Sequence, residues 1–196
     1  MINGLLSLCI LIACATTTLA GKYTTVIIDP GHGGKDRGAK WGGVSEAYLN
    51  LRVAFKVEAL LKAKKIPVVM TRRSDVFLSL SQRARIANRY KDAIFVSIHF
   101  NAHSNTSIRG VETFYASASG RKIASNIQTR LSAYTKTRNR GIKNGIGYAV
   151  LNKTKCPAVL VECGFISNSY ERSRCAKSWY QTLAARGIAE GIIKSR

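Results

Sequence analysis

Short apolar runs alternate along this chain with longer segments in which apolar residues recur every three or four positions. Several of the short runs are unbroken, as in strands that are covered on both faces. The longer segments have the spacing of amphipathic helices. The expected strands are residues 24–29, 67–71, 93–98, 110–116, 148–151 and 158–162. The expected helices are residues 45–64, 79–90, 120–135 and 169–193.

This alternation predicts an α/β fold: a single domain with a twisted, mostly parallel sheet of about six strands and helices on both faces. No repeat, low-complexity tract or linker interrupts residues 21–196, which we therefore expect to form one domain. In open parallel sheets, sites lie beyond the carboxyl ends of the strands. Polar residues at those ends are the first candidates for function.

Four such residues are His32, Glu46, His99 and Glu162. His32 follows the first apolar run through a Pro-Gly turn, His99 follows the run 93–98, and Glu162 closes the last strand. Glu46 opens the first helix behind a plausible N-cap, Ser45. Two imidazoles and one carboxylate can hold a zinc ion and leave a position for water, and a second carboxylate can act as a base. The pattern therefore predicts a zinc hydrolase.

The residues themselves leave the carboxylate ligand open, because Asp29 and Asp36 flank His32 and compete with Glu46. Glu162 ends a strongly apolar run, where a carboxylate is costly to bury without a partner. His103 lies four residues after His99, a spacing that chelates metal on a helix. Its neighbours are typical of a loop. We therefore expect His103 to be exposed, or to contact the metal ligands without binding the metal itself.

Three cysteines follow the first 20 residues, Cys156, Cys163 and Cys175, and none forms a CxxC pair. In an extended strand, at about 3.3 Å per residue, Cys156 and Cys163 are too far apart for a disulfide. Either could pair with Cys175, but buried free thiols are the favoured interpretation. A thiol nucleophile at Cys163 is disfavoured, because strand alternation points it away from the face of Glu162.

The first 20 residues contain no charged side chain, and residues 5–13 have the length of a signal-peptide apolar core. We expect residues 1–20 to be an export signal and residues 21–196 to be the catalytic domain. Two ends of the signal stay open: cleavage after Ala20, or a lipoprotein signal ending before Cys14 and a lipid anchor on that residue. Both lead to an exported protein, in the periplasm or cell envelope.

The net charge of +21, from 31 Lys and Arg against 10 Asp and Glu, indicates a polyanionic partner. The basic residues are scattered, and no interleaved aromatic motif of a single-strand binder is present. We therefore expect no nucleic-acid partner.

The same four residues lie in motifs that resemble the zinc-dependent N-acetylmuramoyl-L-alanine amidases of bacterial cell-wall turnover and cell separation. The resemblance covers roughly residues 24–193, and several motifs occur in order. They are IDPGHGG at 28–34, SEAYLNL at 45–51, the segments 71–72 and 77–80, RARIAN at 83–88, SIHFNA at 97–102 and VECGFISN at 161–168.

The resemblance implies that His32, Glu46 and His99 bind Zn²⁺ and that Glu162 is the catalytic glutamate. It also implies that the substrate is peptidoglycan, cut at the amide between N-acetylmuramic acid and L-alanine. Two alternatives stay open: a zinc peptidase that cuts within the stem peptide, and a catalytically silent peptidoglycan-binding protein.

Some relatives that act in cell division carry a long insert after the strand equivalent to 110–116, which masks the zinc until a protein activator binds. This chain runs almost directly from that strand into the next helix, so we expect no such mask. A protein activator stays an open partner, and we expect a monomer. Candidate groups for peptide carboxylates are Arg72, Arg73 and Lys143.

Overall fold

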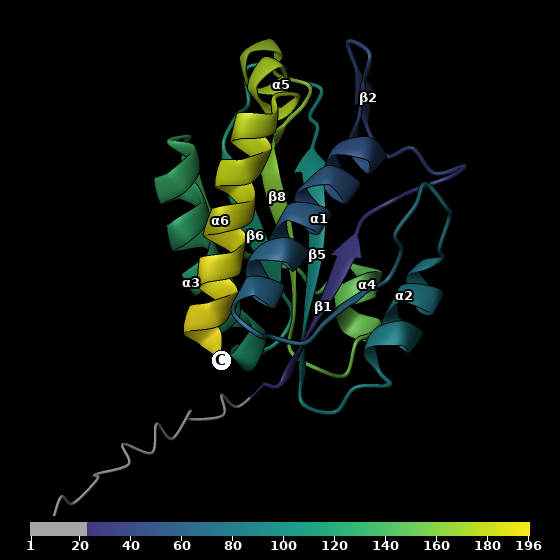
Figure 1. Cartoon of the computed structure of the whole chain (residues 1–196). Helices are drawn as coiled ribbons and strands as arrows, with labels where there is room; N and C mark the ends of the chain where they lie inside the picture. Colours follow the sequence, from purple (N-terminus) through teal and green to yellow (C-terminus); the bar gives the residue numbers. More distant parts are fainter. Residues whose placement is uncertain (1–22) are drawn as a thin grey trace, which may run out of the picture.

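A computed structural model describes residues 23–196, and these residues form one α/β domain (Figure 1). Its central sheet has six strands in the order β4-β1-β5-β8-β6-β7. The strands of this sheet are β1 (Thr25–Pro30), β4 (Val68–Met70), β5 (Ala93–Asn101), β6 (Val111–Tyr115), β7 (Asn139–Asn144) and β8 (Ala158–Phe165). Every neighbouring pair is parallel except β6 and β8, which are antiparallel. The predicted fold class is confirmed.

Helices cover the two faces of the sheet unequally (Figure 1). Three helices of 18 residues, α1 (Glu46–Ala63), α3 (Ala118–Thr135) and α6 (Ser178–Ser195), lie on one face. The shorter α2 (Leu80–Ala87) and α4 (Ala149–Lys153) lie on the other. A small hairpin of β2 (Lys40–Trp41) and β3 (Val44–Ser45) precedes α1, and α5 (Ser169–Cys175) follows β8.

Strand alternation explains why the central strands are apolar throughout. In β1, Val26 and Ile28 pack in the core with α1, α3 and α6, whereas Ile27 packs in the core with α2 and α4. In β8, Val161 packs in the core with α1, α3 and α6, whereas Leu160 packs in the core with α2 and α4. A strand covered on both faces has no polar side to show, which is the pattern that the sequence carries.

One predicted strand is wrong. Residues 148–151 are not a strand, because Ala149 begins the short helix α4, whose Val150 and Leu151 are buried against the sheet. A four-residue apolar run fits a buried helical turn as well as a strand, so periodicity cannot separate the two. The sixth strand is instead β7, with the sequence NRGIKN, which is polar because it lies at the edge of the sheet.

Several element boundaries also differ. The expected helix 169–193 is two helices, α5 and α6, which are separated at Ala176 and Lys177. Strands β5 and β8 do not end at Ile98 and Glu162 but continue to Asn101 and Phe165, so His99 and Glu162 lie within their strands. The prediction of buried free thiols is confirmed, because Cys156, Cys163 and Cys175 are all buried and unpaired.

The predicted export signal, its cleavage after Ala20 and the lipid anchor at Cys14 lie outside the described residues. Within residues 23–196, no helix has both the length and the apolar character needed to cross a membrane.

Candidate metal centre and active site

His32 is held in a tight turn directly after β1. Its φ of 59° is left-handed, a conformation that residues other than glycine rarely adopt. Two buried guanidinium groups fix the turn: Arg83 donates to the carbonyl oxygens of Pro30 and His32 at 2.8 Å, and Arg72 donates to that of Gly31 at 2.9 Å. Strain of this kind persists only where the surroundings enforce it, and it is common at functional sites.

Glu46, the first residue of α1, lies between the two histidines. Its Oε1 atom is 2.8 Å from Nδ1 of His99 and 3.2 Å from Nε2 of His32, and its Oε2 accepts a hydrogen bond from the Ala39 amide at 2.9 Å. One ligand atom from each of His32, Glu46 and His99 lies within 4.8 Å of the others. Gly31 permits this approach, because a Cβ there would lie 2.2 Å from the His99 ring.

These three residues suit a metal ion chemically. Asp36 lies 2.8 Å from Nδ1 of His32, so it orients the ring with Nε2 toward Glu46, as outer-shell carboxylates do for histidine ligands. Burial would raise the pKa of Glu46, but hydrogen bonds to His32 and His99 outweigh it and lower that pKa. An ionised carboxylate between two imidazoles matches the nitrogen and oxygen ligands that zinc takes.

The two competing aspartates do not join this group. Asp29 is buried and is already bonded by Thr71 at 2.6 Å, by Ser97 at 2.8 Å and by Arg83 at 2.8 Å. Asp36 contacts His32 from behind instead. Arg72, a sequence candidate for binding peptide carboxylates, is buried and donates its hydrogen bonds to backbone carbonyl oxygens instead.

Glu162 shares a cavity with the three residues. This cavity has a volume of about 390 Å³, and its lining includes His32, Glu46, His99, Asn101, Tyr148 and Glu162. Oε2 of Glu162 is buried and has no hydrogen-bond partner among residues 23–196. Burial raises the pKa of Glu162 well above its usual value, and the charges of Glu46 and Glu112 add to the effect.

A row of polar side chains crosses three neighbouring strands at this level of the sheet. His99 on β5 is paired with Glu162 on β8, which is paired in turn with Glu112 on β6. Sequence reasoning missed Glu112. The available signal was the one used for Glu162: a carboxylate inside an apolar run, here residues 110–116, which needs a partner.

Two other sequence candidates lie away from the cavity. His103 is exposed, as expected for a loop residue, and is not in the metal-binding group. Cys163 is fully buried on the opposite face of β8 from Glu162, in the core with α1, α3 and α6. Burial raises the pKa of the Cys163 thiol, which argues against a thiolate nucleophile.

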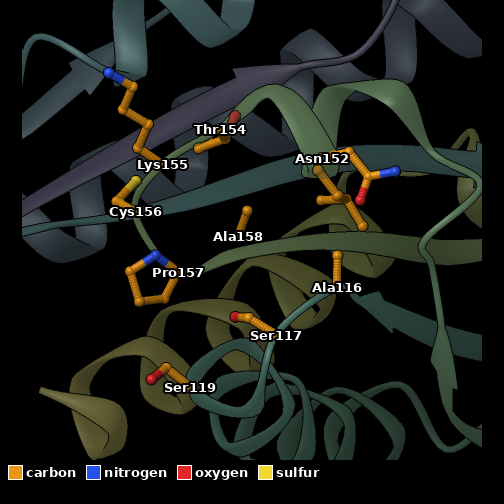
Figure 2. A pocket seen from close by; sticks show the side chains of 10 residues that line it. Ala116, Ser117, Ser119, Asn152, Thr154, Lys155, Cys156, Pro157 and Ala158 are labelled. Atoms are coloured by element: carbon orange, nitrogen blue, oxygen red, sulfur yellow. The ribbon is translucent and has the colours of Figure 1, made fainter.

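A second cavity, of about 410 Å³, lies at the opposite end of β8 (Figure 2). Ser117, Lys155, Cys156 and Ala158 surround it. None of the four predicted site residues lines this cavity, so it is not the candidate active site.

The family of the chain follows from comparison with known proteins. A family model for N-acetylmuramoyl-L-alanine amidases matches residues 26–194. The chain belongs to this family. The predictions of the family and of the enzyme class are thereby confirmed.

Individual amidases agree with this assignment. LytC of Bacillus subtilis is 38% identical over 173 residues, which cover 86% of this chain but 35% of LytC, so the chain spans about a third of that relative. The germination-specific amidase of the same organism is 33% identical over 192 residues, covering 90% of this chain and 80% of its own length.

Solved structures of amidases share the fold. The catalytic domain of CwlV from Bacillus (Paenibacillus) polymyxa var. colistinus has a TM-score of 0.84 and 38% identity, covering 87% of this chain and 97% of its own. CwlD from Clostridioides difficile, solved in complex with the GerS lipoprotein, has a TM-score of 0.84 and 32% identity, covering 88% of this chain and 98% of its own.

Proposed function

We propose that this protein is a zinc-dependent hydrolase that cleaves the amide between N-acetylmuramic acid and L-alanine in peptidoglycan. One observation carries the proposal: His32, Glu46 and His99 have the spacing of metal ligands and share a cavity with Glu162, whose Oε2 has no partner in the described part of the chain. Family membership supplies the bond that is cut.

In this proposal, Nε2 of His32, a carboxylate oxygen of Glu46 and Nδ1 of His99 hold the zinc. A zinc ion bound there would lower the pKa of a water ligand to about 7 and polarise the scissile carbonyl. Asp36 keeps the His32 ring in the tautomer that leaves Nε2 free to bind. Arg72 and Arg83 keep the backbone of the His32 turn in place.

Glu162 is the proposed general base and acid. Its buried carboxylate, oriented into the cavity from the row it shares with His99, takes a proton from the attacking water. It then passes that proton to the nitrogen of the leaving L-alanine, so that the amide becomes a carboxylate and an amine. The raised pKa of Glu162 makes its carboxylate a stronger base toward that proton than an exposed glutamate would be.

The decisive experiment is digestion of purified peptidoglycan followed by mass analysis of the products. Glu162→Gln should reduce cleavage by about 10²–10⁴-fold, the usual contribution of a positioned general base. It should retain bound zinc, measured by elemental analysis, because its ligands are intact. Removal of the metal with a chelator should abolish cleavage, and zinc should restore it.

Glu190→Gln is a matched control, because Glu190 is a half-exposed carboxylate on α6, remote from the cavity. It should retain wild-type cleavage. Full activity of Glu162→Gln or of the metal-free protein would contradict the mechanism. Products with new amines inside the stem peptide would identify a zinc peptidase, and no new amines would identify a silent binder.

Location and partners belong to the proposal as well. We infer that the chain is exported to the periplasm or cell envelope, where peptidoglycan lies, and that it acts there in cell-wall turnover or cell separation. The relative CwlD was solved with a lipoprotein, which supports a protein activator here. Between β6 and α3 lie only Ala116 and Ser117, so no masking insert occurs at that point.

A further inference from the structure

Strand β7 contains one extra residue opposite Glu112. Asn139 is paired with Val111, and Ile142 is paired with Thr113, so that Arg140 and Gly141 together face the single residue Glu112. This is a β-bulge, and the φ of 78° at Gly141 is one that glycine adopts without strain. Bulges near active sites commonly redirect a side chain.

The bulge changes which face the basic residues occupy. Arg140 and Lys143 are three positions apart, an odd spacing that would place them on opposite faces of a regular strand. The extra residue instead brings both to the face of Glu112. There Nε of Arg140 at 2.7 Å and Nζ of Lys143 at 2.6 Å donate to the same oxygen, Oε2 of Glu112.

Two contacts connect this group to the active-site cavity. Asn101, which lines the cavity, donates from Nδ2 to Oε1 of Glu112 at 3.0 Å. Nζ of Lys143 lies 5.7 Å from the ring of Phe114, and that ring contacts the cavity residue Tyr148 with their centroids 4.8 Å apart. The two cations therefore lie one contact away from the cavity, on its β6–β7 side, behind the lining residues Asn101 and Tyr148.

Arg140 and Lys143 also have hydrogen-bond donors that Glu112 does not use. One carboxylate serves both, and Arg140 donates to it through Nε alone, so Nη1 and Nη2 bond no protein group within residues 23–196. Lys143 has a side chain that is 40% exposed. Two cations fixed on a buried carboxylate, with donors left over, are suited to a second anion.

We propose that Arg140 and Lys143 form a subsite for a free carboxylate of the stem peptide, that of the residue following L-alanine. The inference rests on the proposed function, which places the scissile amide beside Glu162. Glu112 lies one strand further along the sheet, about 4.8 Å away, and an extended peptide advances about 3.3 Å per residue. The second residue of the stem peptide is therefore the one that reaches the cations.

The test compares two substrates that differ at one group. MurNAc-L-Ala-D-Glu, with its γ-carboxyl group blocked as a methylamide, carries the free α-carboxylate, and its D-isoglutamine counterpart, blocked in the same way, carries a carboxamide there. The wild type should cleave the first with about tenfold higher kcat/KM, mainly through KM. Arg140→Gln and Lys143→Gln should lose most of this preference. Lys143→Arg, which keeps the positive charge, should retain it.

Arg138→Gln is the matched control, because Arg138 is an exposed cation immediately before β7 with no ion pair to Glu112. It should retain the wild-type preference. A wild type that does not distinguish the two substrates, or variants that lose activity equally on both, would overturn the subsite. Thermal unfolding of each variant identifies any general loss of structure.

A binding measurement separates this inference from the proposed function. Zinc-loaded Glu162→Gln is titrated calorimetrically with the same two compounds, without turnover. About tenfold tighter binding of the carboxylate, reduced in the additional Lys143→Gln variant, supports the subsite even if the wild type cleaves neither compound. Equal affinities, or no binding of either, would contradict the subsite even if the amidase is active.

Discussion

At the scale of single residues, the position of His32 depends on two side chains outside the candidate metal group. Its ring is oriented by Asp36, and its backbone is held by Arg83, a residue 51 positions later in the chain. Both contacts are made at 2.8 Å, and Arg83 is almost fully buried. The geometry of the candidate metal group therefore depends on these two supporting residues as well as on His32, Glu46 and His99 themselves.

Asp36 gives a direct prediction. Asp36→Ala should weaken zinc binding by about 10–100-fold, because the His32 ring loses the carboxylate that orients it. Competition titration with a chromophoric chelator measures the change. The control is Asp75→Ala, which removes a carboxylate that accepts from the Gly34 amide of the same loop at 2.8 Å but does not contact the histidines. Equal affinities for Asp36→Ala and the wild type would contradict the role.

Glu58 gives a pH-dependent prediction. Hydrogen bonds from Arg73, at 2.8 and 3.0 Å, and an ion pair with Lys62 hold the pKa of Glu58 below its usual value, although burial opposes them. A lowered folded-state pKa contributes stability above the unfolded value of about 4.3, and that stability is lost as the pH falls through the folded pKa.

Glu58→Gln should therefore lower the free energy of unfolding by about 0.5–1 kcal/mol at pH 7, a value limited by the solvent exposure of Arg73. The difference from the wild type should shrink in acid and vanish below the folded pKa. Urea denaturation at a series of pH values measures it. A difference that grew toward acid would show that the sign is wrong.

Residue types and local position were enough to propose His32, His99 and Glu162 and to place His103 in a loop, whereas the choice of Glu46 over Asp29 and Asp36 came from the family resemblance. They were not enough to predict the supports. From the sequence, Arg72 was a candidate for binding a peptide carboxylate. In the structure it donates to backbone carbonyl oxygens at 2.8–2.9 Å. Such contacts join segments that are distant in the chain, and no local pattern records them.

At the scale of elements, α6 packs against α3 through two glycines on one face. A Cβ on Gly187 would lie 2.6 Å from the Cα of Leu131, and one on Gly191 would lie 2.4 Å from the Cα of Ile127. Both neighbours are backbone atoms, which cannot relieve the clash by changing rotamer as a side chain can. The four-residue spacing of the glycines lets the two helices approach closely over a full turn.

Gly191→Ala should therefore destabilise the protein. Alanine favours a helix over glycine by about 1 kcal/mol, but overpacking costs about 1–3 kcal/mol. We expect a net loss of about 1 kcal/mol in the free energy of unfolding, measured by urea denaturation. Gly147→Ala is the control, because a Cβ there meets nothing within 4 Å. A more stable Gly191→Ala protein would refute the close packing.

Elements were predicted well where burial imposes a clear pattern and poorly where it does not. The apolar runs of β1, β5 and β8 were recognised because both of their faces are covered. Strand β7 was missed, since an edge strand with Arg140, Gly141 and Lys143 has no apolar alternation to read. The bulge in β7 could not be predicted from the sequence either, because a register shift is defined only by the pairing with the neighbouring strand.

At the scale of the whole molecule, strand order brings the residues of the candidate site together. Residues His99, Glu162 and Glu112 come together only because β8 lies between β5 and β6, with β6 running the opposite way. The sequence predicted that His32, His99 and Glu162 lie at one edge of the sheet, but not which strands are neighbours. Glu112 could therefore not be placed from its sequence position.

The unequal cover of the sheet bears on how a polymer reaches the site. Helix α4 has five residues and separates two cavities, with Val150 lining the active-site cavity and Leu151 lining the other. A substrate that had to thread through a tunnel would need a free chain end. We predict instead that a cavity beside so short a helix, on the thinly covered face, admits a polymer from the side. The proposed amidase would then bind a stem peptide in the middle of a cross-linked glycan strand. It would not need another enzyme to cut the glycan first and create a free chain end.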